Sequence, residues 1–140
     1  MDAPYAAMYA HERSRSSLPA EPEAMHPSSL IYKICPAALW AQAEAAGRFT
    51  GAPVDLADGF IHFSTAAQVG ETAARHFAGQ ADLKLVAVDA AALGPALKWE
   101  VSRGGALFPH LYAPLDLAAV RFVRHLPLAT DGTHAFPPLD

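Results

Sequence analysis

The pattern of hydrophobic positions along the chain predicts most of its secondary structure. A β-rich run over Leu30–Cys35 and a near-continuous apolar run over Leu83–Asp89 are typical of strands. Gly59–Thr65 and Leu97–Val101 alternate between apolar and polar positions, and Val120–Leu126 predicts a last strand. Because Leu83–Asp89 has no polar face, we expect that strand to be buried on both sides.

Two helices are predicted between the strands. The first runs over Ala37–Ala46 and ends at Gly47, where glycine tolerates the left-handed conformation of a helix end. The second covers residues 66–78, since Thr65 has the character of an N-cap and Gln68 completes a capping box.

The order of these elements predicts the fold class. Helices lie early and most strands lie late, which favours an α+β protein with a small, mainly antiparallel or mixed sheet and two to three helices packed to one side. Residues 48–58, rich in Gly, Pro and Asp, predict a loop. We expect a flexible tail over 1–28, one globular domain over 29–128 and a C-terminal tail over 129–140.

Composition narrows the functional class. The chain has 140 residues, of which 52% are hydrophobic, so it can bury a core. Its net charge of −4 argues against a non-specific nucleic-acid binder, which needs basic residues to neutralise phosphates. One cysteine excludes an intramolecular disulfide. No apolar run of about 18 residues and no signal-peptide pattern is present, so we expect a cytoplasmic protein without a membrane partner.

Polar residues at strand ends are the candidates for chemistry. His62 and Ser64, two residues apart on a predicted strand, share a face and can meet one ligand. Histidine is suited to proton transfer near neutral pH. The structural alternative is that Ser64 or Thr65 caps the following helix and that His62 is a hydrogen-bonded, half-buried side chain.

Three more candidates follow later in the chain. Glu100 lies between Trp99 and Val101, and a carboxylate in apolar surroundings is a candidate acid, base or electrostatic stabiliser. The alternative is an exposed strand carboxylate. His110 and Tyr112 share a face if their segment is extended, and could contact a planar ring or a hydroxyl. The alternative for Tyr112 is a core residue with a satisfied hydroxyl.

A metal site and a cysteine nucleophile are weaker hypotheses. His62 and His110 with Glu100 or Asp58 supply the ligand types for zinc or iron, but no His pair has helical or strand spacing. Cys35 follows an apolar strand and is typical of a small buried hydrophobe. We therefore assign no metal ligands.

Taken together, these motifs closely resemble the bacterial domain-of-unknown-function family 952 over roughly residues 30–126. The family has no established activity. The resemblance rests on Ile31-Tyr32-Lys33-Ile34, Trp40, Asp58-Gly59-Phe60-Ile61-His62-Phe63-Ser64-Thr65 with Gln68, the Leu83–Asp89 strand, Trp99-Glu100 and Phe108-Pro109-His110-Leu111-Tyr112.

That family is in turn remotely similar to the ADP-ribosyltransferase superfamily, whose members hold NAD in a split antiparallel sheet. The similarity implies an ADP-ribosyltransferase-like fold, with Lys33 where the superfamily has His or Arg, then the segment from His62 to Thr65, then Glu100. It also implies that Glu100 holds a ribose hydroxyl and stabilises an oxocarbenium-like charge.

Three functions remain open from the sequence. The first is an enzyme acting on NAD or a related ribonucleotide by glycosidic transfer or hydrolysis. In it Glu100 and His62 are catalytic. NAD is then a substrate, and no resident cofactor is implied. The second is a small-ligand binding domain without catalysis, and the third is an interaction module that forms homodimers. The expected ligand contacts are Lys33, Ser64, Thr65, His110 and Tyr112.

Overall fold

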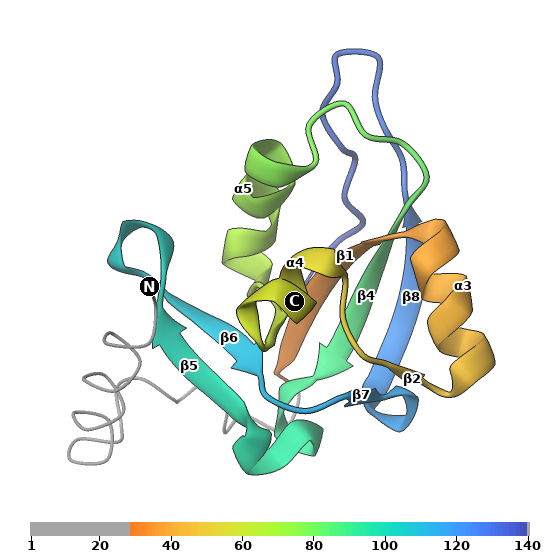
Figure 1. Cartoon of the computed structure of the whole chain (residues 1–140). Helices are drawn as coiled ribbons and strands as arrows, with labels where there is room; N and C mark the ends of the chain where they lie inside the picture. The colour runs from red at the N-terminus through yellow and green to blue at the C-terminus, as the bar shows by residue number, and fades with distance from the viewer. Residues whose placement is uncertain (1–28, 140) are drawn as a thin grey trace.

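A three-stranded antiparallel sheet forms the centre of the protein (Figure 1). The computed structural model describes residues 29–139. The sheet has the strand order β1-β4-β8, with β1 over Leu30–Pro36, β4 over Leu83–Asp89 and β8 over Val120–Leu126. Leu30 pairs with Asp89 in β4, so both apolar runs of the sequence lie side by side in register.

A second three-stranded sheet has the order β3-β6-β5 and is also antiparallel. Its strands are β3 over Ile61–His62, β5 over Leu97–Val101 and β6 over Leu107–Leu111. Two short strands, β2 over Arg48–Phe49 and β7 over Leu115–Asp116, pair in a separate ladder. The remaining short elements are the 3-10 helices η1 Ala90–Ala96, η2 Arg103–Gly105 and η3 Leu117–Ala119.

The segment after β3 joins the two sheets. The Phe63 N–H donates to the carbonyl of Pro109 in β6 at 3.0 Å. One residue later, the Ser64 N–H donates to the Tyr32 carbonyl at 2.9 Å, and the Tyr32 N–H donates to the Ser64 carbonyl at 2.7 Å. This bridge to β1 is isolated, so the pairing stops there and β1 stays an edge strand beyond Tyr32.

The helices begin and end where local chemistry predicts. Helix α3 spans Ala37–Ala46 and ends at Gly47, whose φ of 85° is the left-handed conformation that glycine adopts without strain. Helix α5 spans Ala66–His76, and the Gln68 side chain accepts a hydrogen bond from the Thr65 N–H at 3.0 Å. The helix predictions for these two segments are confirmed, except that α5 ends two residues early.

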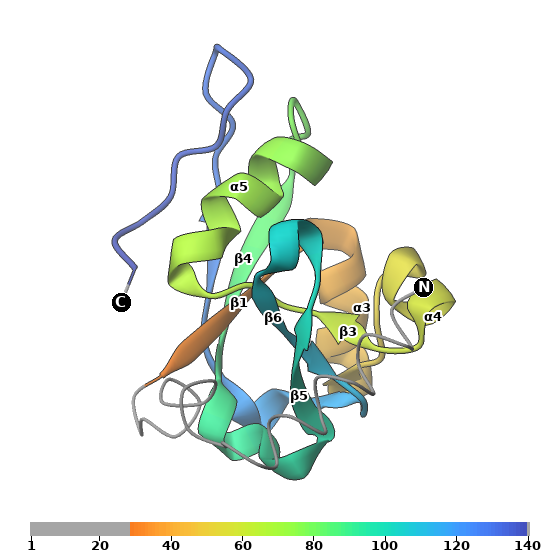
Figure 2. The same ribbon diagram turned by 90° about the vertical axis from the view of Figure 1, so that its left-hand side faces the viewer.

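The prediction that the helices pack to one side is wrong. Trp40 of α3 packs with Ile31 and Val86 on one face of the central sheet, whereas Val69 of α5 packs with Ile34 on the other. Figures 1 and 2 show the two helices on opposite sides of the strands. The reason lies in the apolar runs of β1 and β4, because both faces of these strands need a cover.

Residues 48–58 are not the plain loop that their composition predicts. They contain β2 and the six-residue helix α4, Pro53–Asp58. The C-terminal segment, expected as a tail, bridges Leu128 to His134 and packs Phe136 against the α5 side of the sheet. The predicted N-terminal tail over 1–28 lies outside the described residues.

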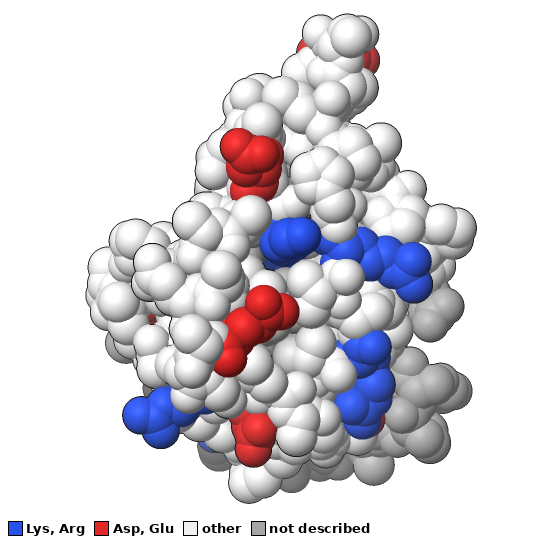
Figure 3. All heavy atoms as spheres, turned by 90° about the vertical axis from the view of Figure 1, so that its right-hand side faces the viewer, with Lys and Arg blue, Asp and Glu red and all other residues white. Residues whose placement is uncertain are grey.

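The surface seen from the right of Figure 1 carries charges of both signs. Lys and Arg side chains lie among Asp and Glu side chains on this face (Figure 3). Within residues 29–139, no helix combines the length and the apolar character needed to cross a bilayer.

Candidate functional site

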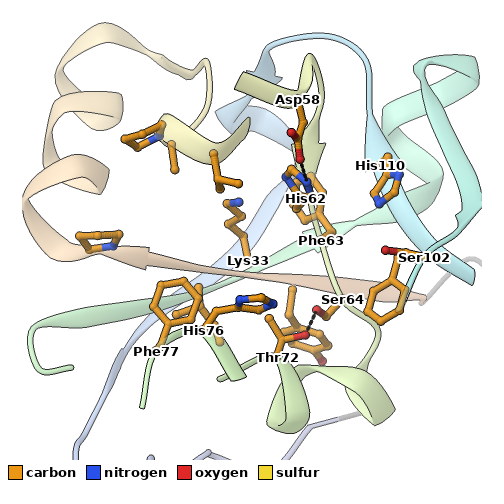
Figure 4. A pocket seen from close by; sticks show the side chains of 17 residues that line it. Lys33, Asp58, His62, Phe63, Ser64, Thr72, His76, Phe77, Ser102 and His110 are labelled. Carbon is orange, nitrogen blue, oxygen red and sulfur yellow. Dashed lines mark hydrogen bonds and ion pairs between the residues drawn. The ribbon is translucent and has the colours of Figure 1, made fainter. Parts of the chain in front are cut away.

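A cavity of about 740 Å³ opens along the edge of β1 where the pairing with Ser64 ends. Residues of α4, α5 and the β3–β6 pair complete its wall. Figure 4 shows Lys33, His62 and Ser64 around this space, with His76 at the end of α5 and Phe77 just after it. Its size is in the range of small-molecule sites, and it combines apolar walls with a few polar groups.

A buried carboxylate beneath the cavity ties three elements together. Asp55 of α4 lies with its oxygens 3.0 and 2.9 Å from Nζ of Lys33 on β1. Asp55 Oδ1 is 2.6 Å from Nδ1 of His62 and accepts from the His62 N–H at 3.1 Å. Asp55 Oδ2 accepts from the Ala52 N–H at 2.7 Å. The short helix therefore holds the side chains of Lys33 and His62 in place.

Opposing effects set the charge state of this cluster. Burial alone would raise the pKa of Asp55, but the hydrogen bond from His62, the charge of Lys33 and the Ala52 amide outweigh it and lower the pKa to about 2. Burial lowers the pKa of Lys33, and Asp55 acts against that change. At neutral pH Asp55 is thus a carboxylate, and its contacts favour a charged Lys33.

The exposed end of His62 meets a second carboxylate. His62 Nε2 lies 2.9 Å from Oδ2 of Asp58, the last residue of α4. The two carboxylates differ in environment, since the side chain of Asp58 is 45% exposed and that of Asp55 is 1% exposed. The His62 ring is therefore held at Nδ1 by the buried Asp55 and at Nε2 by the exposed Asp58.

A second histidine is held in the same manner on β6. His110 Nδ1 lies 2.7 Å from Oε1 of Glu100, and the Tyr112 hydroxyl donates to the same oxygen at 2.8 Å. Both His110 and Glu100 are buried. His110 lines the cavity, whereas Glu100 does not. Glu100 can therefore affect the cavity through its contact with the His110 imidazole.

The Phe60 ring links the two histidines. Its centroid lies 4.1 Å from that of His110 in a stacked arrangement, and 4.6 Å from that of His62. The two imidazole centroids are 5.5 Å apart. Phe60 is itself buried, which fixes both rings at this separation.

Two of the hydroxyl groups that line the cavity come from the segment after β3 and from α5. Ser64 Oγ lies 2.8 Å from Oγ1 of Thr72, and Thr72 Oγ1 lies 3.2 Å from the Gln68 carbonyl, to which it donates. The Gln68 side chain donates to the Leu107 carbonyl at 2.7 Å, so α5 is fastened to β6 beside the cavity.

The structure brings four of the predicted site residues to one cavity: Lys33, His62, Ser64 and His110. Glu100, Tyr112 and Thr65 are not among its lining residues; the first two support His110, and Thr65 starts α5.

Asp55 is a functional candidate that the sequence patterns do not single out, because the composition of residues 48–58 predicts a loop. The available signal was Pro53 at the first helical position and Gly59 just past the last, a spacing typical of a short helix.

The metal and cysteine hypotheses find no further support. In the described part of the chain, no three His, Cys, Asp or Glu side chains form a metal-binding group. Burial raises the pKa of the Cys35 thiol to about 11, so at neutral pH this side chain is a thiol rather than a reactive thiolate.

Comparisons with known proteins agree with the resemblance stated above. The family model described as "Protein of unknown function (DUF952)" matches residues 34–123. Protein CC0527 of Caulobacter crescentus has a crystal structure that is 57% identical in sequence, with a TM-score of 0.74 over 76% of this chain and 93% of that one.

The solution NMR structure of the same protein is 58% identical, with a TM-score of 0.68 over 74% of this chain and 90% of that one. No curated protein is significantly similar to the chain.

Proposed function

Because the chain belongs to DUF952, a family described as of unknown function, we propose an activity from the site itself. The protein binds NAD or a related ribonucleotide in its cavity and cleaves or transfers at the ribose N-glycosidic bond. One observation supports this most: two imidazoles, each fixed at Nδ1 by a buried carboxylate, face one cavity beside a buried ammonium. The predicted remote similarity to ADP-ribosyltransferases is part of the same proposal.

In this proposal His110 accepts the proton. Glu100 holds its Nδ1, so Nε2 is the ring nitrogen that exchanges a proton with a molecule in the cavity. The oxygen of water, or of an acceptor hydroxyl, forms a bond to ribose C1′ while the C1′–N bond breaks. The nitrogen base leaves with that electron pair, and the nucleophile's proton goes to His110. Glu100 is then a positioning residue that stabilises the imidazolium.

The edge of β1 suits the amide of a nicotinamide ring. Main-chain groups alternate in direction along a strand, and both groups of Tyr32 point to Ser64. The N–H and C=O of Ile34 therefore point the same way, and Ile34 lines the cavity. A primary carboxamide can donate to that carbonyl and accept from that N–H. Phe63 and Phe108 supply apolar wall for a planar ring.

Binding without turnover is the second candidate. The position of Glu100 behind His110 favours it, because the carboxylate that the superfamily similarity assigns to the ribose does not line the cavity. The same cavity and the same residues would then hold the ligand unchanged.

One experiment separates the two candidates. The full chain is incubated with NAD, nicotinamide release is followed by chromatography, and binding is followed by thermal shift. We expect release by the wild type and a loss of about 100-fold or more in His110→Asn, as for removal of a general base.

The matched control is His125→Asn, an exposed histidine of β8 outside the cavity. Circular dichroism checks that each variant is folded. Stabilisation by NAD without nicotinamide release would contradict catalysis and support binding alone. The absence of both would contradict the whole proposal.

A further inference from the structure

The Asp58 carboxylate occupies the hydrogen-bonding position beside Nε2, the more exposed ring nitrogen of His62. This carboxylate lies 2.9 Å from Nε2 of His62, and both residues line the cavity. Asp58 ends a helix of six residues and its side chain is about half exposed. An ion pair with such an exposed partner contributes little to stability, so breaking this contact costs little.

Both ring nitrogens of His62 contact a carboxylate. Nδ1 lies 2.6 Å from Oδ1 of Asp55, and Nε2 lies 2.9 Å from Oδ2 of Asp58. A carboxylate offers hydrogen-bond acceptors, so His62 lies between two acceptor groups. Asp55 is buried and also paired with Lys33, whereas Asp58 can move into solvent.

Hydrogen-bond donors outnumber carboxylates in the lining of the cavity. Among the lining residues that the structure describes, Asp58 is the one acidic side chain, beside Lys33 and three histidines, while Asp55 and Glu100 lie behind Lys33 and His110. If Asp58 turns away, the Nε2–H of His62 faces the cavity with no carboxylate on that side. A phosphate oxygen is a strong acceptor for such a donor.

We propose that Asp58 is a built-in competitor for a phosphate-binding position at His62. The ligand's phosphate displaces the Asp58 carboxylate and accepts the hydrogen bond from Nε2. This inference rests on the proposed function in one respect, since it takes the same cavity to be the ligand site. It adds that a phosphate group is what His62 recognises, and that His110, 5.5 Å away between ring centroids, acts on the attached ribose.

The test measures the binding of AMP, adenosine and inorganic phosphate to the full chain by calorimetry. The variant is Asp58→Asn, which keeps the size of the side chain and removes its charge. The control is Asp131→Asn, which removes the same charge from the exposed C-terminal loop. We expect Asp58→Asn to bind AMP and phosphate about fivefold more tightly, as for loss of one like charge near the surface. Adenosine, which has no phosphate, binds as it does to the wild type.

Every other pattern overturns the inference. Equal gains for AMP and adenosine would mean that Asp58 obstructs the cavity by its size. An unchanged or weaker affinity for AMP, the same gain in Asp131→Asn, or no binding of any of the three ligands to Asp58→Asn would remove the competition. The outcome does not depend on turnover, so failure of nicotinamide release leaves this test intact.

Discussion

His62 and His110 face the same cavity, and each is fixed at Nδ1 by a buried carboxylate, but the two carboxylates are compensated differently. Asp55 has a buried ammonium, Lys33, as its partner. Glu100 accepts from His110 and from the hydroxyl of Tyr112. The Asp55 cluster joins β1, α4 and β3, whereas the Glu100 cluster lies within the β5–β6 pair and the residue after it.

This difference indicates which half of the site can be altered without loss of the fold. Removing Asp55 leaves a buried positive charge on Lys33 and releases three elements from one another. Removing Glu100 leaves two donors without their acceptor in a sheet that is otherwise paired. We therefore expect Asp55 variants to lose more stability than Glu100 variants.

The largest effect is expected for Asp55→Ala. Because Lys33 would be left buried and uncompensated, the free energy of unfolding should fall by about 3–5 kcal/mol. Urea unfolding followed by circular dichroism measures it. The double variant Lys33→Met with Asp55→Leu should recover part of the loss, since it removes both charges. A loss below about 1 kcal/mol for Asp55→Ala would mean that the pair is not compensated as described.

A smaller effect is expected for Glu100→Leu, which removes the acceptor for His110 and Tyr112. Loss of this shared acceptor by the buried His110 and by Tyr112 should cost about 1–3 kcal/mol in the same unfolding measurement. Glu100→Gln is the matched control, because it keeps an acceptor oxygen at the same length and should cost less. If both variants lose the same stability, the hydrogen bonds to Oε1 are not the cause.

The Asp55 pair also predicts how stability depends on pH. The pKa of Asp55 is about 2 in the folded protein against an ordinary value of 3.8, so its contribution is complete above pH 4. It is lost as the pH falls from about 4 to 2, because the unfolded chain takes up the proton first. The loss is about 2 kcal/mol. Urea titrations at several acid pH values should show it, and Asp55→Asn should show a flatter dependence over that range.

The smallest effect is expected for Tyr112→Phe. The Tyr112 ring is exposed and keeps its contact with Phe60, while the hydrogen bond from its hydroxyl to Glu100 is lost. The free energy of unfolding should fall by about 0.5–1.5 kcal/mol. A loss as large as that of Glu100→Leu would mean that Tyr112, rather than His110, is the main partner of Glu100.

Local patterns predicted the long elements of this fold, because those elements bury whole faces. The apolar run of Leu83–Asp89 predicts a strand, and the glycine after α3 predicts the helix end, without knowledge of any tertiary contact. Hydrophobic periodicity does not predict helix α4, since six residues give fewer than two turns of a helix. The signal that remained was the pair of Pro53 and Gly59 at its two ends.

The residues of the candidate site also divide into those that local patterns predict and those that only tertiary packing places. Alternation along the strand predicts that His62 and Ser64 share a face, and both residues line the cavity. Spacing gave no means to predict that Asp55 would lie beneath Lys33, 22 residues away in the chain. That contact depends on where α4 packs against β1, which is a tertiary property. The placement of Glu100 behind His110 likewise follows from the pairing of β5 with β6.

The most direct test of the central claim is a titration of the full chain with ADP-ribose, followed by NMR of the histidine side chains. The chain has seven histidines, which can be assigned by single His→Asn variants. We expect the ring signals of His62 and His110 to shift with one saturable binding curve, while those of His125 and His134, outside the cavity, stay in place. Signals of His62 and His110 that do not move at saturating ligand would contradict the assignment of this cavity as the ligand site.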